Sequence, residues 1–275
     1  MERKMKDIIV SLTIIGILIS VALYTLYPLT NNRPPIADAG PDQVVCVGDA
    51  TYFNGTGSDP DGKVILYEWD FDNDGLFDWN STENGAFYFI NGGSQKVFAR
   101  YFYNSVGDYT AKLRITDDNG SKKIDTCVIH VNPSRIKFSL TTKKDSYIIG
   151  ESLNVTVSLK NLYSEAINVS EMSLSKSERP SLRVQVKTPE GYILTYIGGH
   201  VKTLPDGLSL GPNETITYSF PLYLFGNEEN NYYQLKSIGD YEINAIYYSN
   251  PAWCWDTTVW EGKLYSDVLT FTITS

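Results

Sequence analysis

The chain has 275 residues, which is enough for two separate hydrophobic cores. Its 20 tyrosines and 5 tryptophans stand in a background of Asn, Ser, Thr and Gly, a composition typical of strand-rich exported modules and not of disordered chains. The formal net charge of -9 argues against a nucleic-acid partner, because phosphate binding needs clustered Lys and Arg, and it suits divalent cations instead.

The N-terminal segment differs from the rest of the chain. Ile8 to Tyr27 carries no charge, and at about 1.5 Å per helical residue it can cross a hydrocarbon core of roughly 30 Å. Basic residues precede it, so the N-terminus should stay inside and everything after Pro28 should lie outside the cell membrane. We expect a single-pass anchor over residues 1–30. The alternative is a cleaved signal peptide with a small-residue site at Ser20 to Ala22.

After a linker over residues 31–35, apolar residues recur with the period of two that β-strands show. The pattern assigns one inward face to each of two strands: Ile65, Tyr67, Trp69 and Phe71 in the first, and Tyr109, Ala111, Leu113 and Ile115 in the second. Asp118, Asn119 and Gly120 form a turn that leads to a closing strand over residues 128–131. Residues 36–134 therefore predict a β-sandwich.

The order of these pieces resembles a known extracellular module. SDPDGKVILYEWDFDNDGLFDW over residues 58–79, followed by GDYTAKLRITDDNGS over residues 107–121, is similar to the polycystic kidney disease (PKD) domain. The resemblance covers about residues 34–134. It implies an immunoglobulin-like β-sandwich outside the cell, with a function in contact, spacing or adhesion instead of chemistry.

The second region, residues 135–275, shows the same features. Residues 153–159 alternate strictly, with Leu153, Val155, Val157 and Leu159 facing inward. Gly239-Asp240-Tyr241 opens a strand as Gly107-Asp108-Tyr109 does, and its tyrosine resembles the tyrosine corner of immunoglobulin-like sandwiches. We therefore expect an all-β protein: an N-terminal transmembrane helix followed by two immunoglobulin-like β-sandwich domains.

An acidic turn follows the first core strand. Asp70, Asp72, Asp74, Gly75 and Asp78 have the D-x-D-x-D-G spacing of a calcium loop, in which alternate carboxylates converge on one cation. The twelfth position is Ser81 instead of the glutamate of an EF-hand. The alternative is an acidic turn without metal, since the PKD family has an acidic, glycine-bearing turn here for structural reasons.

A second acidic cluster is expected at the other end of the same strand. Asp59 and Asp61 precede the strand and Asp117 and Asp118 follow its neighbour, and in an immunoglobulin-like sandwich those loops meet. The PKD resemblance implies calcium on Asp59, Asp61 and Asp117, while the alternative is that these aspartates only form turns. About 26 Å of strand separates the clusters, so they need separate ions.

Further candidate sites are surface features. Six Asn-x-Ser/Thr triplets are potential glycosylation sites: Asn54, Asn80, Asn119, Asn154, Asn168 and Asn213. Trp253, Trp255 and Trp260 could bind sugar rings or a protein partner if exposed, or could cover an open edge of the second sandwich.

The three cysteines leave at least one unpaired. Cys46 and Cys127 fall on neighbouring strands of the first domain, which an exported protein could join by a disulfide. Strand parity argues against that bond, because Cys127 shares a face with Ile129 and Val131 while Cys46 should point the other way.

Catalysis has little support in the sequence. Of the two histidines, His130 alternates with core positions and His200 follows a Gly-Gly turn, and neither belongs to a zinc or nucleophile motif. We expect no enzyme, and no cofactor beyond Ca²⁺. The predicted function is a membrane-anchored surface protein that makes protein or carbohydrate contacts or acts as a spacer. The alternatives are a carbohydrate-binding accessory module or a subunit of a membrane or secretion complex.

Overall fold

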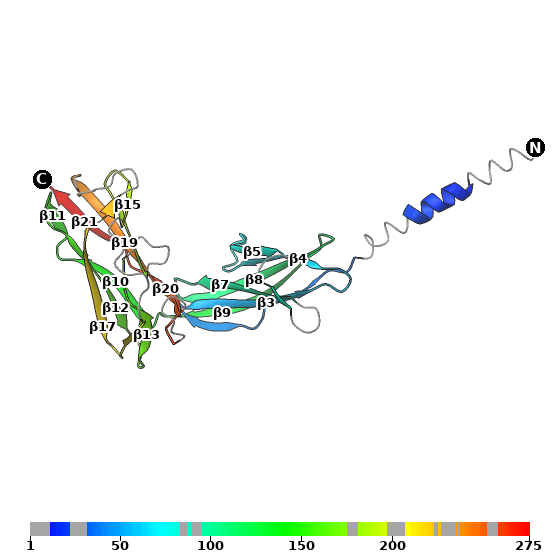
Figure 1. Ribbon diagram of the computed structural model, residues 1–275, viewed down its shortest axis with the longest axis horizontal. Helices are drawn as coiled ribbons and strands as arrows, with labels where there is room; N and C mark the ends of the chain where they lie inside the picture. The colour runs from blue at the N-terminus through cyan, green and yellow to red at the C-terminus, as the bar shows by residue number, and fades with distance from the viewer. Residues whose placement is uncertain are drawn as a thin grey trace, which may run out of the picture. The chain divides into compact units, whose positions relative to one another are not determined.

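The computed structural model describes residues 12–22, 32–82, 87–89, 95–174, 181–196, 207–222, 225–226, 235, 237–251 and 258–275. The chain divides into two compact units. Unit 1 takes in Met1–Gln43, Tyr52–Ala99 and Tyr109–Ile129, and unit 2 takes in Val44–Thr51, Arg100–Asp108 and His130–Ser275. The described residues are mostly β-strand, arranged as immunoglobulin-like sandwiches (Figure 1).

Residues 12–22 form an α-helix within the predicted anchor. Its large apolar side chains are all more than half exposed. Among the residues described, no helix combines the length and the apolar character needed to cross a membrane. The remaining parts of the predicted span, residues 8–11 and 23–27, lie outside the described residues.

Within the described residues, nine strands build the first sandwich. They are β1 (Ile36–Asp38), β2 (Gln43–Cys46), β3 (Ala50–Ser58), β4 (Val64–Asp70), β5 (Trp79–Thr82), β6 (Phe87–Phe89), β7 (Gln95–Phe102), β8 (Gly107–Asp117) and β9 (Lys122–Asn132). One sheet has the order β1-β3-β7-β6 and the other β2-β9-β8-β4-β5. In the second sheet β4 pairs antiparallel with both β8 and β5, so the acidic β4–β5 turn lies at one end of a central strand.

Three of the four predicted core residues of β8 are buried, Ala111, Leu113 and Ile115, whereas Tyr109 is half-buried. The predicted core of β4 needs one correction. Tyr67, Trp69 and Phe71 are buried as predicted, but the inward assignment of Ile65 is wrong, because its side chain is 37% exposed. The register against β8 shifts between Val64 and Leu66. A bulge reverses the alternation of side chains on one side of it, so Val64 occupies the inward position instead.

Two glycines of β3 make room for the largest core side chains. A Cβ atom on Gly55 would stand 2.8 Å from Cζ2 of Trp69, and one on Gly57 would stand 2.9 Å from the hydroxyl of Tyr67. The Tyr67 hydroxyl donates a hydrogen bond to the carbonyl of Gly57 at 3.3 Å. Burial raises the pKa of Tyr67. Because Gly55 and Gly57 have no side chains, the rings of Tyr67 and Trp69 can lie against the backbone of β3.

This packing predicts that Gly55→Ala destabilises the chain. The added methyl group would overlap Trp69, and overpacking of a filled core costs about 1–3 kcal/mol. Thermal unfolding followed by calorimetry should show a lower Tm for the first sandwich. Thr56→Ala is the matched control, since Thr56 lies on the opposite face of β3 and is only half-buried. Equal Tm values for Gly55→Ala and the unmodified chain would contradict the packing argument.

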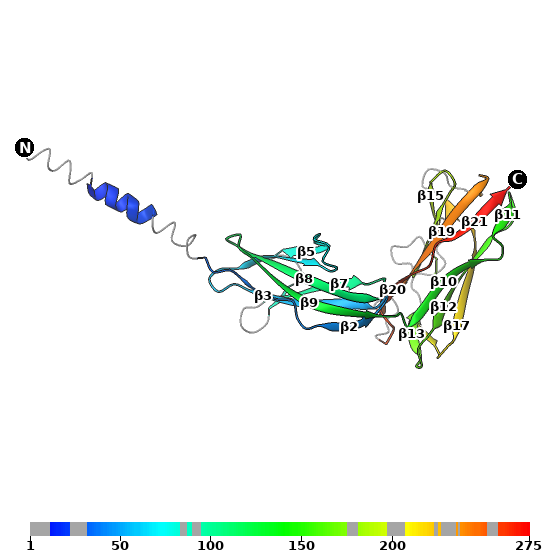
Figure 2. The same ribbon diagram turned by 180° about the vertical axis from the view of Figure 1, so that it is seen from behind.

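The remaining strands build the second sandwich. They are β10 (Ile136–Thr142), β11 (Ser146–Ile148), β12 (Asn154–Asn161), β13 (Ile167–Ser170), β14 (Leu182–Lys187), β15 (Ile193–Tyr196), β16 (Gly207–Leu210), β17 (Thr215–Pro221), β18 (Phe225–Gly226), β19 (Gly239–Ser249), β20 (Gly262–Tyr265) and β21 (Leu269–Thr274). One sheet has the order β10-β12-β17 (Figure 2). A larger sheet has the order β11-β21-β19-β14-β15-β18 with β20 on β19, and β13 pairs with β16.

The alternation predicted for the second sandwich is confirmed. The four inward residues of the 153–159 segment are all buried. Tyr241 is buried at the start of β19, and its hydroxyl donates to the carbonyl of Ser237 at 3.1 Å. This is the contact expected of a tyrosine corner, in which the ring fills the core and the hydroxyl satisfies nearby backbone.

Cys46 and Cys127 both carry free thiols, so the disulfide left open by the sequence is not formed. Cys127 is buried with Ile129 and Val131, as strand parity predicted. Burial, with the charges of two nearby aspartates, raises the pKa of Cys127 to about 11, so this thiol is protonated and unreactive near neutral pH. Cys254 lies outside the described residues.

Candidate functional site

The β4–β5 turn brings three of its four predicted aspartates together. Asp70, Asp72 and Asp78 each offer a carboxylate oxygen, and these oxygens lie within 4.8 Å of one another. Asp70 ends β4 and is fully buried, whereas Asp72 and Asp78 are exposed. Carboxylates at this spacing can share one hard cation, so the triad could hold a metal ion such as Ca²⁺.

The buried carboxylate of Asp70 has one oxygen that the protein leaves unsatisfied. Its Oδ2 accepts hydrogen bonds from the backbone N–H of Gly75 at 3.1 Å and from Nζ of Lys112 at 3.4 Å. Its Oδ1 is buried without a hydrogen-bond partner among the described residues. An unpaired buried acceptor is destabilising, and a cation shared with Asp72 and Asp78 would satisfy it.

Asp74 takes a different position from the one its spacing suggested. Its Oδ1 accepts the backbone N–H of Leu76 at 2.7 Å, and it is absent from the convergent triad. Asn73 and Gly75 have φ values of 61° and 93°, which fold the chain back on itself. Asp74 therefore acts in the turn itself, and within the described residues it does not converge with the other three.

A cross-strand pair holds this turn without help from a metal. Arg114 on β8 lies directly opposite Glu68 on β4 and donates to both carboxylate oxygens, at 2.7 and 2.8 Å. The hydrogen bond to Glu68 raises the pKa of Arg114 despite partial burial. The same guanidinium lies 3.7 Å from the ring centroid of Phe77, a residue of the turn. These contacts of Arg114 with Glu68 and Phe77 therefore hold in place the turn that carries the triad.

The triad predicts a lanthanide-detectable site that depends on Asp72. Terbium replaces calcium on oxygen ligands, and excitation of Trp79, the residue after Asp78, should sensitise its emission. Asp72→Asn removes one ligand while leaving the buried Asp70 in place, so the emission should fall several-fold. Asp74→Asn is the control and should keep most of the signal, because its carboxylate is bonded to Leu76. Equal losses in the two variants would contradict the assigned triad.

The second acidic cluster forms around Asp117 at the end of β8. Asp117 is fully buried, and its Oδ1 accepts the backbone N–H groups of Asn119 and Ser121 at 3.0 and 2.7 Å. Its Oδ2 accepts Nδ2 of Asn32 at 2.9 Å. These bonds make Asp117 the organiser of the turn that follows β8. Asn32, which ties the start of the domain to this turn, carried no signal in the sequence.

The loop before β4 adds the other acidic side chains. Asp61 accepts the backbone N–H of Arg33 at 3.1 Å, and Asp118 accepts that of Lys63 at 3.2 Å. Gly62 lies between the carboxylates: a Cβ atom there would stand 2.6 Å from Oδ2 of Asp59 and 2.4 Å from Oδ1 of Asp118. The missing side chain therefore allows these two acids to approach each other.

Asp59 is the member of this cluster whose pKa is raised. Burial, together with the charges of Asp61 and Asp117, raises its pKa even though an N–H of Asp61 bonds to it. Its Oδ2 is buried without a hydrogen-bond partner among the described residues. The sequence was right that the two loops meet, but only Asp70, Asp72 and Asp78 converge within 4.8 Å in the described part of the chain.

The raised pKa of Asp59 predicts how stability depends on pH and metal. A carboxyl whose pKa is raised by folding contributes stability below its ordinary pKa and loses it as the pH rises through the raised value. Without divalent cations, the unmodified chain should therefore lose stability relative to Asp59→Asn as the pH rises from the ordinary range of an aspartate through the raised pKa of Asp59. Calcium should raise the Tm of the unmodified chain more than that of the variant at pH 7.

Asp61→Asn is a second variant for the same calorimetric series. It removes one of the charges that act on Asp59, so it should reproduce part of the effect on the metal-free Tm. If Tm depended on pH identically in all three proteins, the raised pKa of Asp59 and its effect on stability would be contradicted. An unchanged calcium response would remove Asp59 as a ligand.

The other predicted surface sites lie as follows. Of the six glycosylation triplets, five have exposed asparagines: Asn54, Asn80, Asn119, Asn154 and Asn213. Asn168 is half-buried, and its Nδ2 donates to the hydroxyl of Thr258 at 2.8 Å. Asn119 is exposed, but its Nδ2 donates to Oδ1 of Asn32 at 2.9 Å, so the structure leaves Asn54, Asn80, Asn154 and Asn213 most open to modification.

Among the three tryptophans, Trp260 is described, while Trp253 and Trp255 lie outside the described residues. Trp260 is half-buried against the core of the second sandwich, and its Nε1 donates to Asp49 at 2.8 Å. A Cβ atom on Gly262 would stand 1.9 Å from its ring. Protein groups therefore hold this indole, and a ligand surface formed by the three tryptophans stays a prediction.

Comparison with known proteins identifies the first sandwich. Residues 32–131 match the PKD domain family. Collagenase ColA of Clostridium perfringens is 30% identical over 122 residues, which are 44% of this chain and 9% of that protein. The dyslexia-associated protein KIAA0319 homolog of Rattus norvegicus is 32% identical over 92 residues, 33% of this chain and 8% of that protein. The chain thus spans less than a tenth of either relative.

Solved structures share the β-sandwich fold at low similarity. Carbohydrate-binding modules of the β-sandwich superfamily give a TM-score of 0.28 at 14% identity, over 69% of this chain and 84% of theirs. The two immunoglobulin domains of DIP-gamma give 0.26 at 12% identity, over 88% of this chain and 99% of theirs. At these TM-scores neither structure carries an argument about function.

Proposed function

We propose that this chain, whose residues 32–131 form a PKD domain, is a membrane-anchored cell-surface protein that makes noncovalent protein or carbohydrate contacts or holds a partner away from the bilayer. The observation that carries the proposal is the PKD domain itself, placed directly after an apolar N-terminal segment. PKD and immunoglobulin-like modules are typical of surface or secreted multidomain proteins. The described residues of this chain are built almost entirely of such sandwiches.

The helix over residues 12–22 supports the anchor. Its large exposed side chains are all apolar, which suits a lipid environment better than one face of a globular core. The hydroxyl of Ser20 donates to the carbonyl of Ile17 at 2.8 Å, so this polar group finds its partner inside the helix. In the proposed orientation the N-terminus is inside and both sandwiches are outside. Cleavage as a signal peptide remains the second possibility.

Calcium would act on this function by stiffening the acidic loops. The proposal places one ion on Asp70, Asp72 and Asp78 and a separate one on the Asp59, Asp61 and Asp117 cluster. Extracellular calcium modules bind with Kd values of about 10⁻⁴ to 10⁻³ M, so such sites would be filled outside the cell and empty inside. The unpaired buried oxygens of Asp70 and Asp59 support this view.

Two alternative functions differ in their partners. A carbohydrate-binding accessory module would bind cell-wall sugars without the membrane segment. A subunit of a membrane or secretion complex would be crosslinked in native membranes to one constant partner. We propose a binding role without catalysis in each case. One of the two histidines, His130, lies among the described residues. Its Nδ1 is 2.7 Å from Oδ1 of Asp108, and both side chains are exposed.

The localisation can be tested in the native cells. The chain should pellet with membranes, resist extraction by alkaline carbonate, and lose its sandwiches when intact cells are treated with a protease. A variant that lacks residues 1–30 should no longer pellet with the membranes. Recovery of the full-length chain from the cytosol, protected from the external protease, would contradict the proposal. Release into the medium with residues 1–22 removed would favour the signal peptide.

A further inference from the structure

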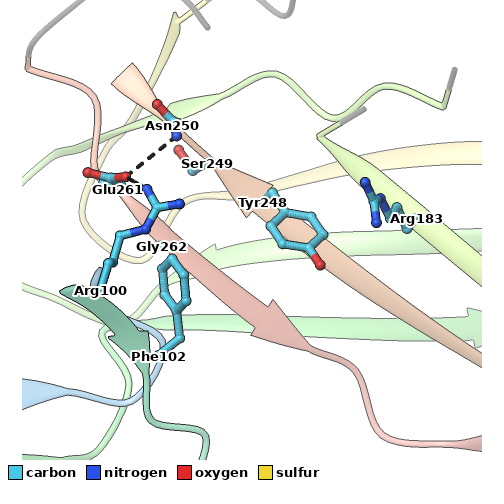
Figure 3. Close-up of a pocket in the computed structure, with 8 residues that line it drawn as sticks. All are labelled: Arg100, Phe102, Arg183, Tyr248, Ser249, Asn250, Glu261 and Gly262. Atoms are coloured by element: carbon cyan, nitrogen blue, oxygen red, sulfur yellow. Dashed lines mark hydrogen bonds and ion pairs between the residues drawn. The ribbon is translucent and has the colours of Figure 1, made fainter. Parts of the chain in front are cut away.

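Unit 2 contains a cavity of about 160 Å³ that the predicted sites do not include (Figure 3). Its walls come from four segments of the chain. Arg100 and Phe102 belong to the end of β7 that lies in unit 2, and Arg183 belongs to β14. Tyr248, Ser249 and Asn250 close β19, and Glu261 and Gly262 lie at the start of β20.

The cavity is cationic although the chain as a whole is acidic. Two arginines and one glutamate line it, in a chain whose formal net charge is -9. Glu261 forms an ion pair with Arg100, and Asn250 also directs its Nδ2 toward this carboxylate at 3.5 Å. Figure 3 shows both contacts on one side of the cavity, with Arg183 on the far side of Tyr248. Glu261 therefore orients Arg100 and leaves the charge of Arg183 uncompensated by the lining residues.

Arg183 contacts an aromatic ring instead of an acid. Its guanidinium lies 5.4 Å from the ring centroid of Tyr248, and Nζ of Lys263 lies 5.5 Å from the same centroid. Among the described residues Arg183 makes no ion pair. Since no acid among the described residues engages it, the guanidinium is able to bind a carboxylate through two parallel hydrogen bonds.

The size and walls of the cavity indicate what carries that carboxylate. A cavity of about 150 Å³ accommodates benzene, so about 160 Å³ accommodates one six-membered ring. The ring of Phe102, with the Arg100 guanidinium 5.2 Å from its centroid, supplies an apolar wall. An aspartate or glutamate side chain of a protein partner would offer the same charge but would leave most of the space unfilled.

We propose that this cavity binds a hexuronate residue of an acidic polysaccharide, with its carboxylate at Arg183 and its ring against Phe102. The inference rests on the proposed function and names the ligand class of one contact. It requires neither calcium nor the three predicted tryptophans.

The test is calorimetric titration of the full chain in detergent with a tetramer of galacturonic acid, in parallel with a neutral tetramer of galactose. Arg183→Gln is the informative variant, because Arg183 is exposed and its loss should leave the fold intact. Lys187→Gln is the matched control: it removes the same charge from the same face of β14, four residues away from the cavity. Hydrogen bonds to a charged group are strong enough that Arg183→Gln should weaken uronate binding about tenfold or more.

Each outcome decides the proposal. Binding of the uronate but not of the neutral sugar, lost in Arg183→Gln and kept within about twofold in Lys187→Gln, supports it. Absence of uronate binding, or equal losses in the two variants, overturns it. A glutamate-rich peptide that binds more tightly than the uronate would overturn it in favour of a protein ligand. None of these results bears on the membrane fractionation, so failure here is distinguishable from failure of the proposed localisation.

Discussion

The packing of β4 against β3 is the constraint on which the first sandwich depends. Tyr67 and Trp69 are the largest buried side chains of this domain, and they fit because Gly55 and Gly57 present bare backbone to them. Phe53 lies on β3 two residues before Gly55, and its ring centroid is 4.9 Å from that of Trp69. Close packing on one face of β4 leaves no freedom for the strand to slip, because a shift of one residue would turn these rings toward solvent.

A fixed β4 also fixes the acidic turn that follows it. Asp70 is the last residue of the strand and keeps the buried environment of the residues before it. The register places Lys112 opposite Asp70 and Arg114 opposite Glu68, so two cations of β8 meet two acids of β4. Lys112 compensates the charge of Asp70 only in part, since it approaches one oxygen at 3.4 Å and the other remains unpaired. The geometry with which this turn could hold a metal ion is therefore a consequence of how the core is packed.

The sequence predicted the fold class and the acidic loops, because both depend on local spacing. A period of two identified Tyr67, Trp69 and the core of β8, and the alternate aspartates identified a turn in which three of four converge. The bulge at Ile65 escaped prediction, since it depends on the register with β8 and not on the strand's own residues. The spacing of Asp74 also fits a ligand, but its carboxylate accepts the backbone N–H of Leu76 and lies outside the convergent triad.

The arginine-lined cavity lay beyond sequence reasoning, because its walls come from four segments, spread from Arg100 to Gly262, that the fold assembles. The turn at Gly48 helps to build this cavity, and the turn at Gly150 has the same backbone conformation. Gly48 and Gly150 have φ values of 88° and 84°, and each precedes an acid that accepts the N–H three residues earlier: Asp49 from Cys46 and Glu151 from Ile148.

These two turns share a backbone but differ in the use of their acids. Glu151 pairs with the exposed Lys144 nearby, whereas Asp49 receives Arg135 at 3.0 Å and the indole N–H of Trp260 at 2.8 Å. Trp260 in turn packs on Gly262, a wall of the cavity, at a distance that excludes any side chain there. A carboxylate whose local role is to close a turn thus also positions an aromatic ring behind the cavity. The same small motif therefore closes a turn in both places and, at Asp49, also supports a candidate binding site.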